Sequence, residues 1–198
     1  MLTGRLCGRL MSDSDELLMR LAQQGRTDAF EELVCRYRRP LLRVAVSKLG
    51  DAVAAEDLVQ ETLLAAYAAR ATFNPQFAFR TWLWTIALRL CQRQWKRNAS
   101  PKAAGGMIAP SAADATPVFA DTGLDQLLRS ERSDLLHQAL AALPEVQADA
   151  IRLRFFGGLP YEDIAAAMQS SVSGAKQRVR LGLERLAVQL RHWAGTES

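Results

Sequence analysis

The sequence has few cysteines, few histidines and no long apolar run, and each shortage argues against a class of protein. Its 3 cysteines (Cys7, Cys35 and Cys91) are far apart and form no Cys-x-x-Cys pair, and its 2 histidines stand alone. No zinc-ligand set is therefore present. Because apolar residues flank Cys35 and Cys91 in helical patterns, we expect both to be buried, reduced thiols. No nucleophile or carboxylate constellation surrounds either histidine. We therefore expect no enzyme activity, no cofactor, no metal and no small-molecule substrate.

The sequence also lacks a segment that could enter a membrane. No stretch of about 18 uncharged apolar residues occurs, so we expect no membrane insertion. Residues 1–10 carry Arg5 and Arg9 without a continuous apolar segment, which argues against a secretory signal. Met11 opens a more ordinary acidic start, so we expect residues 1–11 to be a disordered or artefactual N-terminus.

The formal net charge of +4 conceals three blocks of charge. Residues 51–69 contain four acidic residues and no basic one, whereas residues 70–100 contain six basic residues and no acidic one. Residues 172–193 contain five basic residues against a single acid, Glu184. Blocks of this kind point to binding partners more than to a fold.

The spacing of apolar residues predicts an all-α protein of two small helical domains joined by a flexible linker. Residues 12–97 show successive amphipathic helices, with a loop over 73–79 and a proline, Pro40, that should bend or briefly interrupt the second helix. Residues 98–125 are rich in Ala, Gly, Pro, Ser and Thr and have no period, which indicates the linker. Residues 126–192 restart the helical pattern.

The second domain contains a helix-turn-helix pattern. A short helix over 161–168 is followed by a turn at 169–171 and by a longer helix. The apolar stripe of the longer helix predicts these buried residues: Val172, Ala175, Val179, Leu183, Leu186 and Leu190. The remaining positions of its first turns carry side chains that can pair with base edges or phosphates. These candidates are Ser171, Ser173, Gly174, Lys176, Gln177, Arg178 and Arg180.

Aromatic and basic residues interleave between residues 73 and 97. Aromatic rings stack on unpaired bases and cationic side chains hold the phosphate backbone, so the mixture suits single-stranded nucleic acid. We expect about half of the aromatic residues in this segment to be buried, with Phe79 and one tryptophan in the core. The candidate binding residues are Phe73, Asn74, Phe77, Arg80, Trp82, Trp84, Arg89, Arg93, Trp95, Lys96 and Arg97.

Two ordered sets of motifs resemble the extracytoplasmic-function sigma factors of bacterial RNA polymerase. The first set is similar to regions 2.2 to 2.4 of that family and comprises residues 56–61 (EDLVQE) and 79–87 (FRTWLWTIA). The second set is similar to regions 4.1 and 4.2 and comprises residues 140–144, residues 158–165 and the basic helix from Val172. Any helix-turn-helix protein could supply the second set alone, whereas the ordered pair is specific.

The resemblance implies a promoter-specificity subunit with three contact surfaces. Residues 70–97 would capture the melted minus-10 element, with one base flipped into a pocket near 73–79, and the helix from Ser171 would read the minus-35 duplex. Core RNA polymerase, promoter DNA and an anti-sigma factor are the implied partners, and the implied location is the cytoplasm, on the nucleoid when polymerase is bound. The acidic helix would dock on core RNA polymerase through Glu56, Asp57, Leu58, Gln60 and Glu61.

The sequence departs from the family at several positions. Arg89 and Arg93 stand where the family usually has Asn and Asp, so the minus-10 preference cannot be carried over. At the turn, Gln169 and Ser170 replace a usual Gly-Ile, which removes a glycine that such a turn favours.

Two other functions fit parts of the sequence. A free-standing helix-turn-helix repressor or activator would use residues 12–97 for dimerisation or sensing. An interaction protein that mimics a sigma factor would titrate a regulator without binding DNA, but such a mimic has no use for the basic segment. Reversal of the charges at Asp57 and Glu61 separates the first alternative from a sigma factor, since a repressor would keep its DNA binding.

Overall fold

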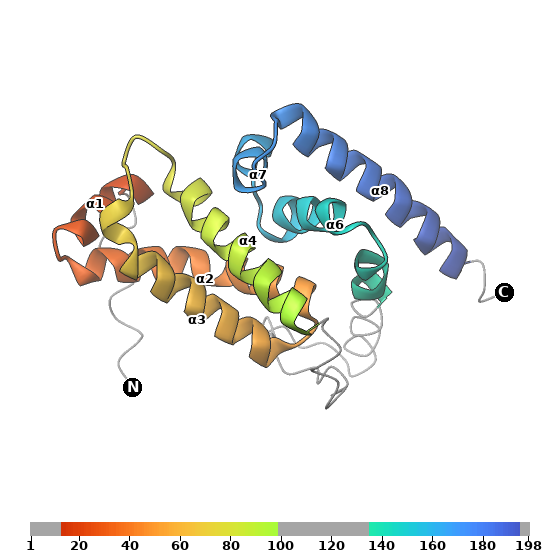
Figure 1. Cartoon of the computed structure of the whole chain (residues 1–198), viewed down its shortest axis with the longest axis horizontal. Coiled ribbons are helices and arrows are strands. Elements are labelled where there is room, and N and C mark those ends of the chain that lie inside the picture. The colour runs from red at the N-terminus through yellow and green to blue at the C-terminus, as the bar shows by residue number, and fades with distance from the viewer. Residues whose placement is uncertain (1–12, 99–134, 195–198) are drawn as a thin grey trace, which may run out of the picture.

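The computed structural model describes residues 13–98 and 135–194, and both segments are built from helices without a strand (Figure 1). The all-α fold class is thereby confirmed. The expected N-terminal segment (residues 1–11) and nearly all of the expected linker (98–125) lie outside the described residues, as does the start of the second expected domain. Within the two described segments, no helix has the length and apolar character to cross a membrane.

Four α-helices and one short 3-10 helix form the first module, which we define as residues 13–98. Ser14 begins the first helix by accepting a hydrogen bond from the Leu17 N–H, and Asp51 caps the third in the same way. Gly50 ends the second helix with a φ of 69°, a conformation that glycine adopts without strain. This second helix continues through Pro40, so the interruption expected there does not occur. The elements are α1 (Asp15–Gln23), α2 (Thr27–Leu49), α3 (Ala52–Ala68), η1 (Arg70–Thr72) and α4 (Phe79–Asn98).

The second module, residues 135–194, ends in the predicted helix-turn-helix. Residues 135–141 are helical, and Pro144 stands at the N-cap of the next helix. In the turn, Ser171 Oγ accepts a hydrogen bond of 3.0 Å from the Gly174 N–H and caps the last helix. The remaining elements are α6 (Glu145–Ile151), the short π-helix η3 (Arg152–Phe156), α7 (Tyr161–Ala167) and α8 (Val172–Ala194).

The buried stripe of α8 differs from the predicted one. Gly182 faces α6 so closely that a Cβ at this position would lie 2.7 Å from Ile151 Cδ1. This approach buries Ala175, Val179, Gly182 and Leu186. Leu183 and Leu190, which were predicted to be buried, are 38% and 39% exposed. The prediction was wrong for these two leucines because a glycine, which apolar spacing ignores, sets the face on which α8 packs.

The two modules pack against each other and share one apolar core. Leu83 and Trp84 of α4 belong to the same buried cluster as Leu153, Leu159 and Ile164 of the second module. Figure 1 shows α7 beside the first turns of α4, with α8 on the outside. Charge and linker composition separate the two modules in the sequence, yet their packing makes them one closed body.

Candidate nucleic-acid and partner interfaces

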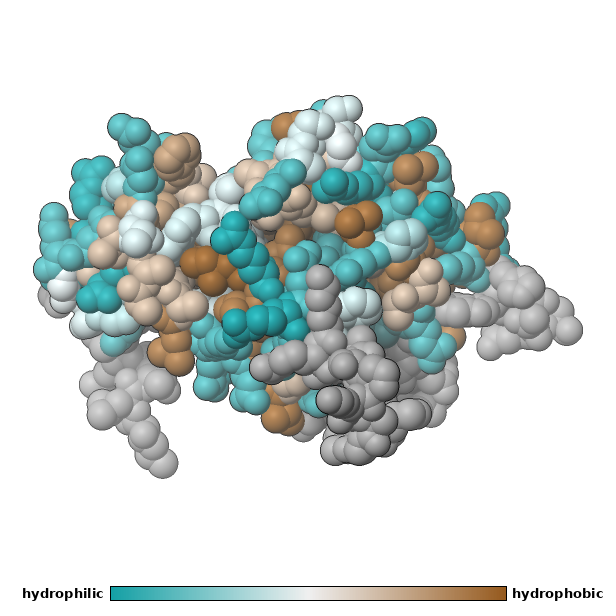
Figure 2. Space-filling model, in the orientation of Figure 1, coloured by the Kyte–Doolittle hydropathy of each residue, from teal (hydrophilic) through white to brown (hydrophobic). Residues whose placement is uncertain are grey.

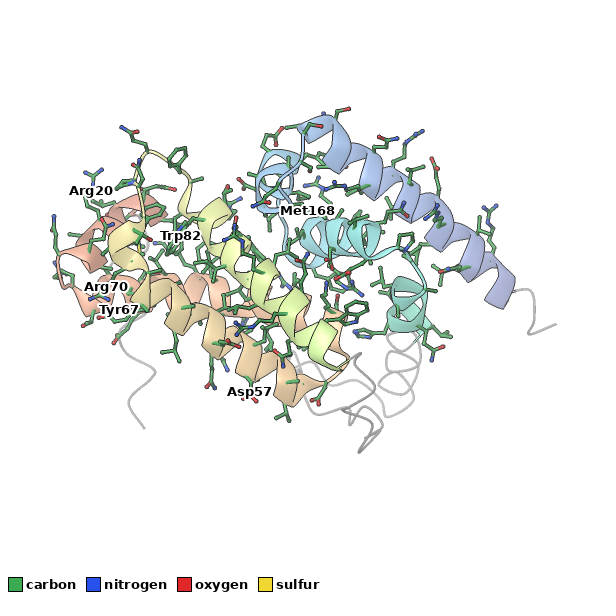
Figure 3. The ribbon with its side chains drawn as sticks, viewed as in Figure 1. Arg20, Asp57, Tyr67, Arg70, Trp82 and Met168 are labelled. Carbon is green, nitrogen blue, oxygen red and sulfur yellow. The ribbon has the colours of Figure 1, made fainter. Side chains whose placement is uncertain are left out.

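The acidic face of α3 points outward from the first module. Asp57, Gln60 and Glu61 are exposed, and Figure 3 shows Asp57 directed away from the body of the protein. Leu58, which was predicted to contact a partner, is buried among core side chains instead. It lies on the side of α3 that faces the core, so its contribution is to hold α3 in place.

An apolar side chain that sequence reasoning missed joins this acidic face. Leu64 is 69% exposed and lines a shallow groove with Asp57, Gln60 and Glu61. Its spacing was a usable signal, because Leu64 follows Asp57, Gln60 and Glu61 at the helical intervals that place residues on one face. The face therefore combines negative charge with exposed apolar surface, which is typical of a protein-binding site.

Two arginines of neighbouring helices pair with the acidic face. Arg38 Nη2 lies 2.8 Å from Glu56 Oε2, and Arg93 Nη2 lies 2.8 Å from Glu61 Oε1. Arg93 was predicted to contact DNA. Because its ion pair is exposed, the pair contributes only ~0–1 kcal/mol and a partner can displace it.

The aromatic segment is half buried, as predicted. Phe73, Phe79 and Trp84 are buried, whereas Phe77 is 66% exposed, Trp95 is exposed and Trp82 is half-buried. Phe73 and Trp84 were predicted to contact DNA, but both are core residues in the structure. Phe73 packs against the rings of Phe79 and Trp82, with centroid distances of 5.8 and 5.3 Å. Figure 3 places Trp82 on the side of α4 that faces η1.

The loop before α4 displays Phe77 to solvent. Asn74 shapes the loop, because its side-chain Oδ1 accepts a hydrogen bond of 3.0 Å from the Gln76 N–H and its carbonyl accepts one of 3.0 Å from the Phe77 N–H. The loop ends where the Phe79 N–H donates to Glu16 Oε1 at 3.0 Å, which ties the start of α4 to α1. Phe77 is thus held on a defined turn with its ring available for stacking.

The basic residues of α4 have different surroundings. Arg89 is exposed. Arg80 Nη1 lies 3.7 Å from Asp163 Oδ2 of α7, and a hydrogen bond with Tyr37 raises the pKa of Arg80. Burial and a hydrogen bond to Asp15 raise the pKa of Tyr37 in turn, so the phenol stays protonated. The side chains of Lys96 and Arg97 lie outside the described residues.

The first half of α8 presents a polar and basic face. Ser173, Lys176, Gln177 and Arg180 are exposed at helical spacing, and Arg178 is half-buried. Lys176 Nζ lies 5.7 Å from the centroid of the Tyr161 ring, which belongs to α7. The remaining candidates, Ser171 and Gly174, form the cap at the start of the helix. This arrangement fits the major groove of duplex DNA.

The cysteines and acidic residues provide no metal site in the described part of the chain. Cys91 is buried as predicted, whereas Cys35 is exposed on α2, so its predicted burial was wrong. Neither among residues 13–98 nor among residues 135–194 do three or more His, Cys, Asp or Glu side chains converge in a way that could hold a metal ion.

Comparison with known proteins gives two family matches in the order that the sequence predicted. Residues 33–100 match the family described as Sigma-70 region 2, and residues 133–186 match the family described as Sigma-70, region 4. The first match runs from within α2 to the end of α4, and the second runs through α6, η3 and α7 into α8.

Whole-length relatives agree with the family matches. The chain is 33% identical over 174 residues to the RNA polymerase sigma-H factor of Pseudomonas aeruginosa, covering 86% of this chain and 90% of that protein. It is 31% identical over 173 residues to the ECF RNA polymerase sigma-E factor of Haemophilus influenzae, covering 84% and 89%.

Two solved structures share the fold. The sigma factor RpoE of Bartonella quintana, solved in complex with the anti-sigma factor NepR, matches with a TM-score of 0.61 and 29% identity, covering 82% of this chain and 96% of that one. CnrH, solved in complex with the cytosolic domain of CnrY, matches with a TM-score of 0.69 over 91% of this chain and 99% of that one. At 22% identity, the second likeness concerns the fold.

Proposed function

Since the chain belongs to the extracytoplasmic-function family of RNA polymerase sigma factors, we propose that three of its surfaces divide the work of transcription initiation. The acidic face of α3 binds core RNA polymerase, the Phe77 loop with α4 captures the melted minus-10 strand, and α8 reads the minus-35 duplex. One observation carries this proposal: an acidic helix face and a basic recognition helix lie on separate outer surfaces of one chain, α3 along one edge and α8 along another (Figure 1).

The acidic face suits a protein partner and excludes DNA. Asp57 and Glu61 would repel phosphate, whereas their charges complement a basic polymerase surface and Gln60 can add a hydrogen bond to it. Exposed Leu64 adds apolar area that becomes buried on docking. Glu61 is released from Arg93 in the process, which returns Arg93 to the basic surface of α4.

The Phe77 loop and α4 supply the two elements that bind unpaired DNA. The Phe77 ring stacks on a base, and Arg89, with Arg80 once it is separated from Asp163, holds the phosphate backbone. Phe73 supports the loop from the core side through its contacts with Phe79 and Trp82.

The α8 helix supplies duplex recognition. Lys176 and Arg180 contact phosphates or guanine edges, and Gln177 can pair with adenine. Ser173 lies on the same face, one turn before Lys176 and Gln177 and two turns before Arg180, and the backbone N–H groups of the first turn point at phosphate.

The partners and location follow from the same proposal. The protein acts as a non-enzymatic subunit of RNA polymerase in the cytoplasm, and an anti-sigma factor controls it. Support for the last point comes from RpoE of Bartonella quintana, which was solved with the anti-sigma factor NepR.

In vitro transcription with core RNA polymerase and a genomic promoter library tests the proposed function. We expect the full chain to direct initiation at promoters that share a minus-10 and a minus-35 element. The charge-reversed variant D57K/E61K should lose polymerase binding and transcription while it keeps its affinity for the minus-35 duplex. Asp28→Lys, which also reverses an exposed acid of the same module, is the matched control and should retain transcription.

Two results would contradict the proposal. DNA binding without any polymerase-dependent transcription would identify a free-standing helix-turn-helix regulator. Equal loss of transcription in D57K/E61K and in Asp28→Lys would show that the face of α3 has no particular role.

A further inference from the structure

The first helix, α1, runs along the loop that precedes α4. At one end of the loop, Gln23 Nε2 donates a hydrogen bond of 2.8 Å to the carbonyl of Phe73. At the other end, Glu16 Oε1 accepts a hydrogen bond of 3.0 Å from the Phe79 N–H. Glu16 and Gln23 lie two turns apart on one side of α1, so the loop follows the helix between these two contacts.

Arg20 lies on α1 between the two contact points. It follows Glu16 by four residues and precedes Gln23 by three, which places it beside them at the solvent edge of the same side of the helix. Its side chain is exposed. The ring of Phe77, which is 66% exposed, stands on the adjoining loop. An exposed cation of α1 therefore borders the loop that carries an exposed aromatic ring.

Two other arginines at this end of the module are already engaged. The guanidinium of Arg70 lies 4.2 Å from the centroid of the Tyr67 ring, and its Nη1 donates a hydrogen bond of 2.9 Å to the Tyr67 carbonyl. Arg26 pairs with Asp28 at 2.6 Å. Figure 3 places Arg20 at the same end of the module as Tyr67 and Arg70. Within the described part of the chain Arg20 forms no ion pair, so its charge is available to an external anion.

The surface at this end of the molecule suits a charged ligand. On the face that Figure 2 shows, hydrophilic residues are mixed there with weakly hydrophobic ones, and they leave no continuous, strongly hydrophobic area. Single-stranded DNA offers a phosphate that a guanidinium can bind and a base that an aromatic ring can stack on. Because phosphates and bases alternate along one strand, neighbouring groups of the same strand can reach both Arg20 and Phe77.

We propose that Arg20 and Phe77 form a clamp on the melted strand, in which Arg20 neutralises the phosphate next to the base that stacks on Phe77. The strand then passes between α1 and the loop. The inference rests on the proposed function where that function assigns the loop to unpaired DNA. It adds a residue of α1, a helix to which the motifs and the composition of the sequence assigned no contact.

Arg20→Gln in the holoenzyme reconstituted with core RNA polymerase tests the clamp. The measured quantity is the affinity for a promoter fragment in which mismatches hold the minus-10 strands apart. We expect the substitution to weaken this affinity about threefold to tenfold and to reduce the salt slope by about 0.7, as for one single-strand phosphate contact. Arg20→Lys keeps the charge and should retain most of the affinity. Arg39→Gln removes an exposed arginine of α2 and is the matched control, which should change neither quantity.

Neutral backbone linkages identify the phosphate that Arg20 binds. A methylphosphonate replaces one charged phosphate at a time along the melted strand. We expect one linkage whose neutralisation weakens binding by the unsubstituted chain about as much as Arg20→Gln does. The same linkage should have no further effect in Arg20→Gln, because both changes remove one contact.

Three results would overturn the clamp. The first is an affinity and a salt slope in Arg20→Gln equal to those of Arg39→Gln, and the second is additive effects of Arg20→Gln and every neutral linkage. The third is weaker binding of Arg20→Gln to core polymerase without DNA, which would make Arg20 a protein contact.

The unsubstituted holoenzyme keeps the two proposals distinct. If it binds the melted fragment no more tightly than the fully paired one, the proposed function fails and the clamp fails with it. If it prefers the melted fragment and Arg20→Gln binds equally well, the clamp alone fails and the proposed function stands.

Discussion

The two surfaces expected to bind DNA have similar chemistry but different accessibility. The face of α8 carries exposed Lys176, Gln177 and Arg180 with nothing from the other module above it, whereas α7 and Gly157 cover the first turns of α4. Figure 1 shows α8 on the outside of the molecule and α4 between the other helices. The basic face of α8 is therefore open to solvent, whereas α4 is covered on the side that meets the second module and keeps Arg89 and the preceding Phe77 exposed.

The two helices differ in accessibility because their apolar residues lie on different faces. The α8 helix buries a narrow stripe of small residues around Gly182 and leaves its basic face in water. The α4 helix carries Leu83 and Trp84, and both side chains are buried in the core that the two modules share. The contrast between a free and a covered face can be tested by substitutions on each.

The largest effect is expected at the covered face. Trp84→Ala should lower the free energy of unfolding by ~3–5 kcal/mol, because it removes a fully buried indole and leaves a cavity between the modules. Denaturant titration of the full chain measures the change. Trp82→Ala is the matched control and should cost clearly less, since Trp82 is half-buried. Equal losses in the two variants would break the distinction between a covered and an open side of α4.

Removal of the exposed ring should affect function without affecting stability. Phe77→Ala is expected to slow promoter opening by the reconstituted holoenzyme about tenfold, because one base-stacking platform is lost. Its free energy of unfolding should stay within ~0.5 kcal/mol of the unsubstituted value. Fluorescence of a promoter labelled at the melted region follows the opening rate. Normal opening would remove Phe77 from the strand-binding surface.

The open face of α8 should respond through affinity for duplex DNA. Arg180→Ala is expected to weaken binding to the minus-35 duplex about threefold to tenfold and to reduce the salt slope by about one. Arg191→Ala removes an exposed arginine from the far end of the same helix and should change neither quantity. Binding titrations at several salt concentrations provide both numbers. An effect of Arg191 equal to that of Arg180 would indicate general attraction instead of a defined face.

The smallest effect concerns the turn that positions α8. Gln169 has a φ of 52°, which an L side chain adopts with strain. Gln169→Gly should therefore raise the free energy of unfolding by ~0.5–1 kcal/mol. Gln177→Gly makes the same exchange inside α8 and should lower the free energy of unfolding by ~1 kcal/mol. One variant is thus expected to stabilise the protein and the other to destabilise it. Thermal unfolding distinguishes them, and destabilisation by both would show that the turn is not strained.

Much of this picture could be predicted from the sequence. Local signals placed the helices and their ends: Asp51 caps α3, Gly50 ends α2, and Ser171 caps α8. The block of acidic residues on α3 and the basic face of α8 also follow from the order of residues along one helix. The departure at Gln169 was visible as well, since the turn adopts a left-handed conformation that glycine would favour.

The remaining features depend on contacts between segments about 50 to 100 residues apart, which periodicity does not encode. The sequence could not show that Lys48 meets Asp149, or that Trp84 meets Gly157. For the same reason Leu58 was assigned to a partner although it packs inside the module. The prediction that about half of the aromatic residues between 73 and 97 are buried is correct, but only packing determines which of them are.

A comparison of two charge-reversed chains tests the central claim most directly. D57K/E61K and Asp28→Lys are each assayed for binding to core RNA polymerase and for binding to the minus-35 duplex. We expect D57K/E61K to lose polymerase binding and keep duplex binding, whereas Asp28→Lys keeps both. Polymerase binding by D57K/E61K as tight as that of the unsubstituted chain would contradict the account, because the acidic face of α3 would then not be the docking surface.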